Sequence, residues 1–159
     1  MTTLYLVRHC EAMGNIRRIF QGHIDEGISG NGRRQLERLT ERFRDVPLDA
    51  IYSSPLQRAM YTAEAVDGAH GLPIVQDRRL MEIHGGVWEG KPWKMLPLLC
   101  PVQSFKWNRA PWDFHPRKGK QSGAWMTSYK DQWIDEEGIN HRPHVSVTMN
   151  LPYDFHEYV

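Results

Sequence analysis

An arginine next to a histidine near the amino terminus could bind and transfer a phosphate group. Arg8 and His9 directly follow the apolar run Leu4 to Val7. A guanidinium group binds phosphate oxygens well, and a neutral imidazole nitrogen can attack phosphorus. The same pair could also lie on the surface after any strand, so these two residues alone do not separate a site from a solvated dipeptide.

The residues before this pair predict the element that positions it. The run Leu4 to Val7 is continuously apolar, which is typical of a parallel strand buried on both faces. In open α/β sheets, ligands bind beyond the carboxyl ends of the strands. We therefore expect a buried parallel strand with Arg8 and His9 at its carboxyl end.

The residues after this pair resemble a known signature. Arg8-His9-Cys10-Glu11-Ala12 is followed by Asn15, Gln21-Gly22 and Asp25. This order resembles the opening signature, in its Arg-His-Gly-Glu form, of the histidine phosphatase superfamily, the phosphoglycerate-mutase-like enzymes. The resemblance implies that Arg8, Asn15, Gln21 and Gly22 bind phosphate. Cys10 stands where the family usually has glycine, and a positive φ there would strain a cysteine.

A second strand and helix carry another candidate phosphate ligand. The pattern predicts a helix that is capped by Ser29 and ended by Pro47, followed by a strand over residues 48–52. The next helix begins near Pro55 and carries Arg58 in its first turns. Without the first motif, Arg58 would be an exposed helical arginine in an intrahelical ion pair. With it, the resemblance implies that Arg58 is a second phosphate clamp.

A short strand at residues 74–75 precedes the third candidate. The segment 79–90 resembles the family's Leu-x-Glu stretch followed by Gly-x-Trp-Glu-Gly. By this resemblance Glu82 protonates the leaving oxygen and then helps water to attack the phosphoenzyme. That role needs a raised pKa, from burial or nearby negative charge. We expect Trp88 to pack beneath the site and His84 to be a structural neighbour.

These motifs together imply a fold and a reaction. The fold is α/β, three-layer with a mostly parallel sheet, phosphoglycerate-mutase-like, with its carboxyl-terminal part truncated or replaced. The reaction is phosphoryl transfer through a phosphohistidine on His9, with Arg8 and Arg58 on the equatorial oxygens and neither metal nor other cofactor. We expect hydrolysis of small phosphate monoesters or a mutase-like transfer, with impaired activity.

The impairment is expected because the family's second catalytic histidine is not found. The resemblance ends near Lys106, whereas a complete member has a later strand that ends in Ser-His-Gly. His144 precedes a strand-like run and would reach the site only if that strand ran antiparallel to the others. The other histidines after Glu82 are His84, His115, His141 and His156.

The carboxyl-terminal part suggests a different origin. Residues 113–150 are similar to a fragment of thimet-oligopeptidase-like zinc metallopeptidases. His156-Glu157 begins a His-Glu-x-x-His pattern, but the second histidine is missing, so we expect no metal site. We divide the chain into a histidine-phosphatase-like portion, 1–110, and a divergent tail, 111–159, which arose by fusion or divergence. A fusion predicts exposed or loosely packed tryptophans, namely Trp107, Trp112, Trp125 and Trp133.

Composition limits the remaining alternatives. A chain of 159 residues with 40% hydrophobic residues can bury one core, and a formal charge of +1 argues against bulk nucleic-acid binding. Its two cysteines form neither a disulfide framework nor a metal motif, and no apolar run reaches membrane-spanning length. We expect a cytoplasmic protein whose partner is a small phosphorylated substrate, with no nucleic acid and no membrane.

Three hypotheses for the function stay open, and so do the role of one basic loop and the oligomeric state. The alternatives to an active enzyme are a non-catalytic phosphate-binding remnant or fusion product and, more weakly, a zinc metallopeptidase fragment. Arg17 and Arg18, with Gln21, either line the mouth of the site and favour a second anionic group or belong to a solvated basic loop. A homodimer would result if an exposed sheet edge paired with a second copy.

Overall fold

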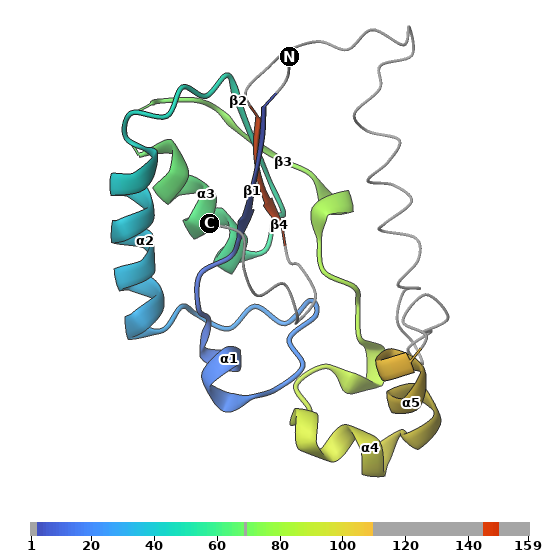
Figure 1. Ribbon diagram of the computed structural model, residues 1–159. Helices are drawn as coiled ribbons and strands as arrows, with labels where there is room; N and C mark the ends of the chain where they lie inside the picture. The colour runs from blue at the N-terminus through green and yellow to red at the C-terminus, as the bar shows by residue number, and fades with distance from the viewer. Residues whose placement is uncertain (1–2, 69, 110–144, 150–159) are drawn as a thin grey trace, which may run out of the picture.

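A parallel sheet with helices packed on it forms the main body of the chain (Figure 1). The computed structural model describes residues 3–68, 70–109 and 145–149. The strands are β1 (Leu4–Arg8), β2 (Ala50–Ser53), β3 (Ile74–Gln76) and β4 (Val145–Met149). The α-helices are α1 (Met13–Arg17), α2 (Gly30–Phe43), α3 (Gln57–Asp67), α4 (Leu96–Leu99) and α5 (Pro101–Arg109). Short 3-10 helices span Arg78–Leu80, Gly86–Trp88 and Trp93–Met95.

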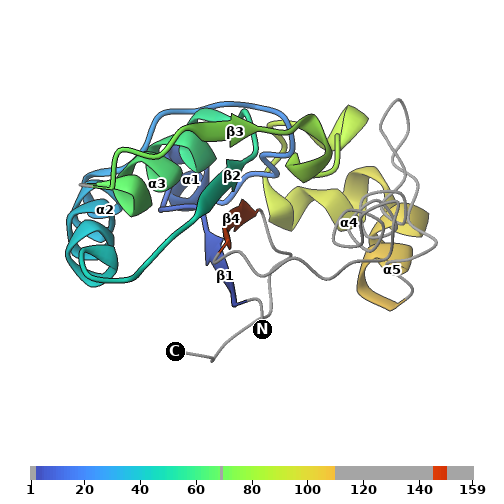
Figure 2. The same ribbon diagram turned by 90° about the horizontal axis from the view of Figure 1, so that it is seen from above.

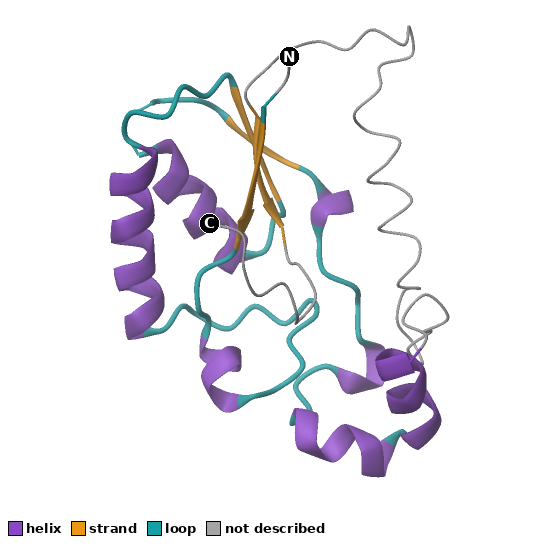
Figure 3. Cartoon of the chain, viewed as in Figure 1, coloured by secondary structure: helices purple, strands orange, loops and turns teal. Residues whose placement is uncertain are grey.

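The sheet is parallel throughout its described strands. Its order is β1-β4-β2-β3, with Arg8 opposite Met149 and Ser53 opposite both Thr148 and Gln76. All four strands therefore end at the same edge, and the loops that leave this edge are seen below the strands in Figure 3. The segments after β1, β2 and β3 carry His9, Arg58 and Glu82, so the expected parallel sheet brings all three to one edge.

The burial of β1 differs from the prediction. The prediction of burial on both faces is wrong, because Leu4 and Leu6 are 37% and 48% exposed. Tyr5 and Val7, on the other face, pack against the core formed by Phe43 and its neighbours. Side chains alternate between the two faces of a strand, and the described helices α2 and α3 cover only one of them. Figure 2 shows both helices on one side of the sheet.

Helices α2 and α3 start as the sequence predicts. The Ser29 hydroxyl accepts a hydrogen bond from the Gly32 N–H at 2.9 Å, which caps α2. Helix α2 ends at Phe43, four residues before Pro47, and Phe43 joins Ile51, Ala63 and Val66 in a buried cluster. Helix α3 begins at Gln57, close to the expected start near Pro55. This cluster fixes α2 and α3 against the sheet.

A second core lies beyond the strand ends. Phe20, Ile83, Trp88 and Leu96 are buried there, and Trp107 packs on them from α5. The Trp107 ring centroid lies 5.9 Å from those of Phe20 and Trp88. The expectation that Trp107 is exposed or loosely packed is therefore wrong, because α4 and α5 fold its ring back onto this cluster. Trp112, Trp125 and Trp133 lie outside the described residues.

Strand β4 comes from the segment that the sequence analysis treated as a tail. It lies between β1 and β2 and runs parallel to both. The antiparallel arrangement that would bring His144 to the site is therefore wrong, because the carboxyl end of β4, at Met149, is the end at the site edge. His115, His141, His144 and His156 lie outside the described residues, and the division at residue 110 stays a prediction. None of the helices in the described ranges combines the length and the apolarity needed to cross a bilayer.

Candidate active site

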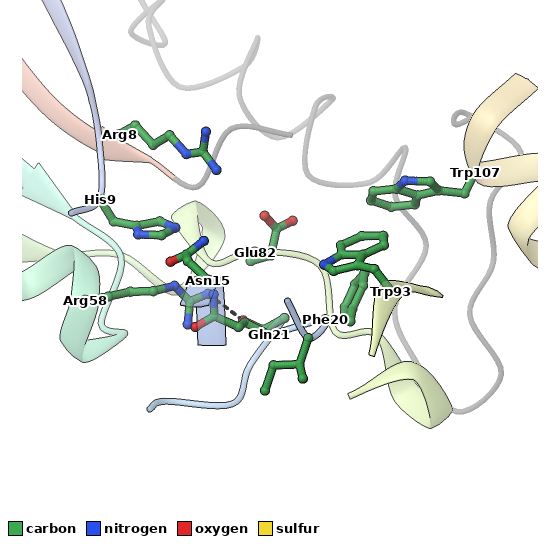
Figure 4. A pocket seen from close by; sticks show the side chains of 11 residues that line it. Arg8, His9, Asn15, Phe20, Gln21, Arg58, Glu82, Trp93 and Trp107 are labelled. Atoms are coloured by element: carbon green, nitrogen blue, oxygen red, sulfur yellow. Dashed lines mark hydrogen bonds between the residues drawn. The ribbon is translucent and has the colours of Figure 1, made fainter. Parts of the chain in front are cut away.

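All the residues predicted for the site line a single pocket at the carboxyl edge of the sheet (Figure 4). They are Arg8, His9, Asn15, Gln21, Gly22, Arg58 and Glu82. Arg8 ends β1 and His9 follows it, Arg58 lies in the first turn of α3 after β2, and Glu82 follows β3 and a 3-10 turn. The pocket is small, with a volume of about 50 Å³, and it suits a group of the size of a phosphate.

The His9 ring is held in the tautomer that a nucleophile needs. Its Nδ1 lies 2.6 Å from the backbone oxygen of Cys10. A carbonyl oxygen can only accept, so Nδ1 carries the hydrogen and donates it, which leaves a lone pair on Nε2. The pKa of His9 is lowered from 6.5 to about 4, mainly because the ring is buried. The hydrogen bond to Cys10 raises this pKa, whereas the positive charges of Arg58 and Arg8 lower it further. The imidazole is therefore neutral near pH 7.

Arg58 is a buried cation fixed by two backbone carbonyls. Its side chain is 1% exposed, and its two terminal nitrogens donate to the backbone oxygens of Ile24 at 2.9 Å and Gly22 at 2.7 Å. Burial of a guanidinium is costly without such partners and nearby carboxylates. Arg58 therefore presents a positive charge in a preset position, which is what a phosphate clamp requires.

The pKa of Glu82 is raised, whereas that of His9 is lowered. Burial raises the pKa of its carboxyl from 4.5 to about 7, and the charge of Glu89 adds to the rise. The Ile83 N–H, which donates to Glu82 Oε1 at 2.8 Å, and the charges of Arg58 and Arg8 lower that pKa but do not cancel the effect of burial. Between the two pKa values His9 is neutral and Glu82 is protonated, which are the states of a nucleophile and a proton donor.

Asn15 and Gln21 complete the polar wall of the pocket. Asn15 Oδ1 accepts a hydrogen bond from the Ala12 N–H at 2.8 Å at the start of α1. The amide NH2 of Asn15 takes no part in this hydrogen bond. Gln21 lies across Gly14, where an added Cβ would come within 2.4 Å of Gln21 Cδ. A larger residue at position 14 would therefore collide with the Gln21 side chain. Arg17 forms an ion pair with Glu26 at 2.9 Å.

Two residues that the sequence analysis gave no role hold the pocket loops together. The Glu89 carboxylate accepts from the backbone N–H groups of Gly85 at 2.6 Å, Ile24 at 3.1 Å and His23 at 3.2 Å. His23 Nε2 lies 2.8 Å from the backbone oxygen of Glu82, and its ring packs edge-on to His84. The Gly-x-Trp-Glu-Gly pattern already contained Glu89, but its long-range partners have no signal in the sequence.

Cys10 fits its turn without strain. Arg18 is the one non-glycine residue with a positive φ among those the structure describes, so the conformation that would strain a cysteine is not used. The Cys10 N–H donates to Thr62 Oγ1 at 2.9 Å, and this hydroxyl donates to the Arg58 backbone oxygen at 2.8 Å. Thr62 thus ties the turn after β1 to helix α3. Burial also raises the pKa of the Cys10 thiol.

The expected packing of Trp88 and His84 is confirmed. Trp88 is 1% exposed beneath the pocket, and its ring centroid lies 5.6 Å from that of Phe20. His84 contacts His23 and does not line the pocket, and among the described lining residues His9 is the one histidine. No group of three or more histidine, cysteine or acidic side chains in the described ranges is arranged to hold a metal ion.

Comparisons with known proteins agree with this geometry. The chain is 38% identical over 90 residues to "Phosphoserine phosphatase 1" of Hydrogenobacter thermophilus, which covers 57% of this chain and 43% of that protein. The chain spans about half the length of the curated relatives it matches. Among solved structures, "Bacillus stearothermophilus YhfR" is 36% identical with a TM-score of 0.79, covering 93% of this chain and 74% of that one.

The fold and the family follow from the same comparisons. A phosphoglycerate mutase from Bacillus anthracis superposes with a TM-score of 0.76 at 21% identity, over 93% of this chain and 74% of that one, which confirms the α/β phosphoglycerate-mutase-like fold. The model of the histidine phosphatase superfamily, branch 1, matches residues 4–142. This match runs well past Lys106, and the metallopeptidase resemblance of residues 113–150 has no support. The chain belongs to the histidine phosphatase superfamily.

Proposed function

We propose that the chain transfers a phosphoryl group from a small phosphate monoester to His9 and then to water. The observation that carries this proposal is the opposed pKa perturbation of two groups in one pocket, with His9 near 4 and Glu82 near 7. Relatives named as a phosphatase and a mutase support the reaction class. The proposed partner is the phosphorylated substrate, and the cytoplasm stays the expected compartment because both cysteines are unpaired.

In the first step His9 Nε2 attacks phosphorus, and the bond between phosphorus and the ester oxygen breaks. The leaving oxygen takes the proton of Glu82, so a neutral alcohol departs and a phosphohistidine and a carboxylate are left. Arg8 and Arg58 stabilise the charge on the equatorial oxygens. The negative charge of a bound phosphate raises the pKa of Glu82 further, which favours the protonated form at the start of the reaction.

In the second step a water molecule attacks the phosphohistidine while the Glu82 carboxylate removes a proton from that water molecule. Inorganic phosphate is formed, Nε2 regains its lone pair, and Glu82 is protonated again. A hydroxyl group in place of water would complete a mutase-like transfer. Adding glycerol during turnover of an aryl phosphate distinguishes a phosphatase from a transferase. A phosphatase should release inorganic phosphate and the phenol in equal amounts, whereas transfer to glycerol would release less inorganic phosphate than phenol.

A second candidate function is phosphate binding without turnover. It is favoured by one observation, namely that His9 is the one histidine among the described residues that line the pocket. In this case Arg58 and Arg8 would still bind phosphate esters. The two functions differ in whether a phosphohistidine forms, and a single assay distinguishes them.

The test is steady-state hydrolysis of 4-nitrophenyl phosphate, with a chelator present, by the wild-type chain and by His9→Ala. We expect chelator-resistant turnover that His9→Ala abolishes, with kcat/KM rising as His9 loses its proton near pH 4. With an alkyl phosphate, whose leaving oxygen needs the acid, kcat/KM should also fall as Glu82 loses its proton near pH 7. Circular dichroism is used to check that both proteins are folded. If the wild-type protein is folded but shows no turnover, the enzymatic function is refuted and phosphate binding without turnover is supported.

The acid role of Glu82 has its own test. Protonation of the leaving oxygen matters more for an alkoxide than for nitrophenolate, because the alkoxide is the far stronger base. Glu82→Gln should therefore lower kcat/KM for an alkyl phosphate by about 10²–10⁴-fold and for 4-nitrophenyl phosphate much less. Equal losses for the two esters would contradict proton donation by Glu82.

A further inference from the structure

A second and much larger cavity adjoins the phosphate pocket. Its volume is about 650 Å³, within the range of about 300–1,000 Å³ that is typical of small-molecule sites. Asn15, Trp93 and Trp107 line both cavities, so the two are neighbours with a shared wall. The smaller pocket can hold little more than the phosphate, and the rest of any ester must therefore lie in adjacent space.

The position of the proton donor indicates which adjacent space this is. In Figure 4 Glu82 lies between His9 on one side and Trp93 and Trp107 on the other. An in-line attack by His9 expels the leaving oxygen on the side opposite the attacking nitrogen, next to the acid that protonates it. The alcohol part of the ester therefore extends past Glu82 toward the two indole rings, which line both cavities.

The walls of this cavity are mainly aromatic and apolar. Trp88, Trp93, Trp107 and Leu96 line it, and the ring centroids of Trp93 and Trp107 lie 5.8 Å apart with an angle of 46° between the ring planes. Such walls favour a flat aromatic ring, which gains contact area and edge-to-face or offset stacking. A small polyol would gain little contact with these rings and would have to exchange its hydration for the few polar groups in the wall.

One polar group in the wall also indicates a ligand. Ser104 of α5 is 6% exposed and lines the cavity, and its Oγ has no hydrogen-bond partner among the described residues. A buried hydroxyl without a partner costs about 1–3 kcal/mol of stability, and a ligand atom in the cavity would supply the missing hydrogen bond. Ser104 can donate to or accept from a polar atom on a ring that occupies the cavity.

Charge argues against a substrate with a second anionic group in this cavity. Arg18 is the one charged side chain among the described residues that line it, and Arg18 is exposed to solvent. Arg17, which the sequence also suggested for the mouth of the site, forms its ion pair with Glu26. Dianionic recognition ordinarily uses several converging donors, as Arg8 and Arg58 provide in the phosphate pocket.

We propose that the aromatic cavity between α4, α5 and the phosphate pocket binds the alcohol part of the substrate, and that preferred substrates are phosphate monoesters of alcohols that carry an aromatic ring. This inference rests on the proposed function for the position of the reacting phosphorus, but the binding preference can be measured without turnover. Ser104 and Trp107 are then specificity-determining residues.

The experiment compares 2-phenylethyl phosphate, glycerol 3-phosphate and 3-phosphoglycerate. The first two leave as primary alkoxides, so their intrinsic reactivities are similar and a difference in kcat/KM reports recognition. Binding of the same esters to His9→Ala by titration calorimetry provides a readout that needs no catalysis. Ser104→Leu fills the cavity and Trp107→Ala removes one wall, while Phe105→Ala, on the same helix and 66% exposed outside the cavity, is the matched control.

We expect 2-phenylethyl phosphate to exceed glycerol 3-phosphate by about tenfold or more in kcat/KM and in affinity for His9→Ala. Ser104→Leu and Trp107→Ala should each reduce this ratio severalfold, and Phe105→Ala should leave it unchanged. A ratio near one, a ratio that neither cavity variant alters, or a preference for 3-phosphoglycerate would overturn the proposal. Absence of turnover for all esters, with selective binding to His9→Ala intact, would instead refute the proposed catalysis and retain the cavity as the ring-binding site.

Discussion

Burial of Glu82 predicts that the stability gap between the wild type and Glu82→Gln depends on pH. In the unfolded chain this carboxyl has its ordinary pKa of 4.5, whereas in the folded protein its pKa is about 7. The folded state thus keeps a proton that the unfolded state releases, so the contribution of Glu82 to stability falls as the pH rises from 4.5 through 7. At about 1.36 kcal/mol per pH unit, this shift corresponds to a loss of about 3 kcal/mol above pH 7.

The glutamine variant removes this titration and keeps the shape of the side chain. At pH 4 the carboxyl is mostly neutral in both states, and the two proteins should have similar free energies of unfolding. At pH 8 we expect Glu82→Gln to be more stable than the wild type by about 3 kcal/mol. The lowered pKa of His9 acts in the opposite direction, with stability lost as the pH falls from 6.5 through 4, but it is present in both proteins and cancels in the comparison.

The assay is urea unfolding followed by circular dichroism at pH 4, 6 and 8. Glu64→Gln is the matched control, because Glu64 is exposed on α3 and undergoes the same chemical change. Its stability difference from the wild type should be small at every pH. A difference between Glu82→Gln and the wild type that stays constant from pH 4 to pH 8 would refute the raised pKa and, with it, the assignment of Glu82 as proton donor.

Three substitutions test the framework around the pocket by urea unfolding. Gly22→Ala should lower the free energy of unfolding by about 2 kcal/mol or more, because its Cβ would lie 1.9 Å from a Glu89 oxygen at a φ of +33°. Gly27→Ala, with nothing within 4 Å, is the control, and equal effects would contradict the close approach. Trp88→Ala should cost about 3–5 kcal/mol, and a cost well below this would contradict its burial. Ser29→Ala should cost about 1 kcal/mol through loss of the α2 cap, and no cost would argue against that cap.

The candidate site was predictable because its residues stand in motifs that resemble those of a known family and that follow predicted strands. His9, Arg58 and Glu82 each follow a short apolar segment, and parallel strands deliver such residues to one sheet edge. The His9 tautomer was not predictable, because it depends on a contact with the backbone oxygen of Cys10. The contacts of Glu89 with the 21–25 loop were missed for the same reason, since they join segments that are more than sixty residues apart.

The fold was predictable in class but not in arrangement. Local patterns identified strands at residues 4–7, 48–52 and 74–75, and the structure has strands close to all three. The order of strands within a sheet has no local signal, so the insertion of β4 between β1 and β2 could not be inferred. The same limit explains β1: an apolar run indicates a core strand but not whether a second layer covers Leu4 and Leu6.

The place of β4 also sets the spacing of the two segments that carry His9 and Arg58. β1 is made first, but in the described sheet its neighbour is β4, which is made more than 130 residues later. Neighbouring strands lie about 4.8 Å apart, so β4 spaces β1, which leads to His9, and β2, which leads to the helix that carries Arg58, about 10 Å apart. Without β4, both strands would keep unpaired backbone groups along their facing edges, so the alignment of His9 with Arg58 depends on residues 145–149.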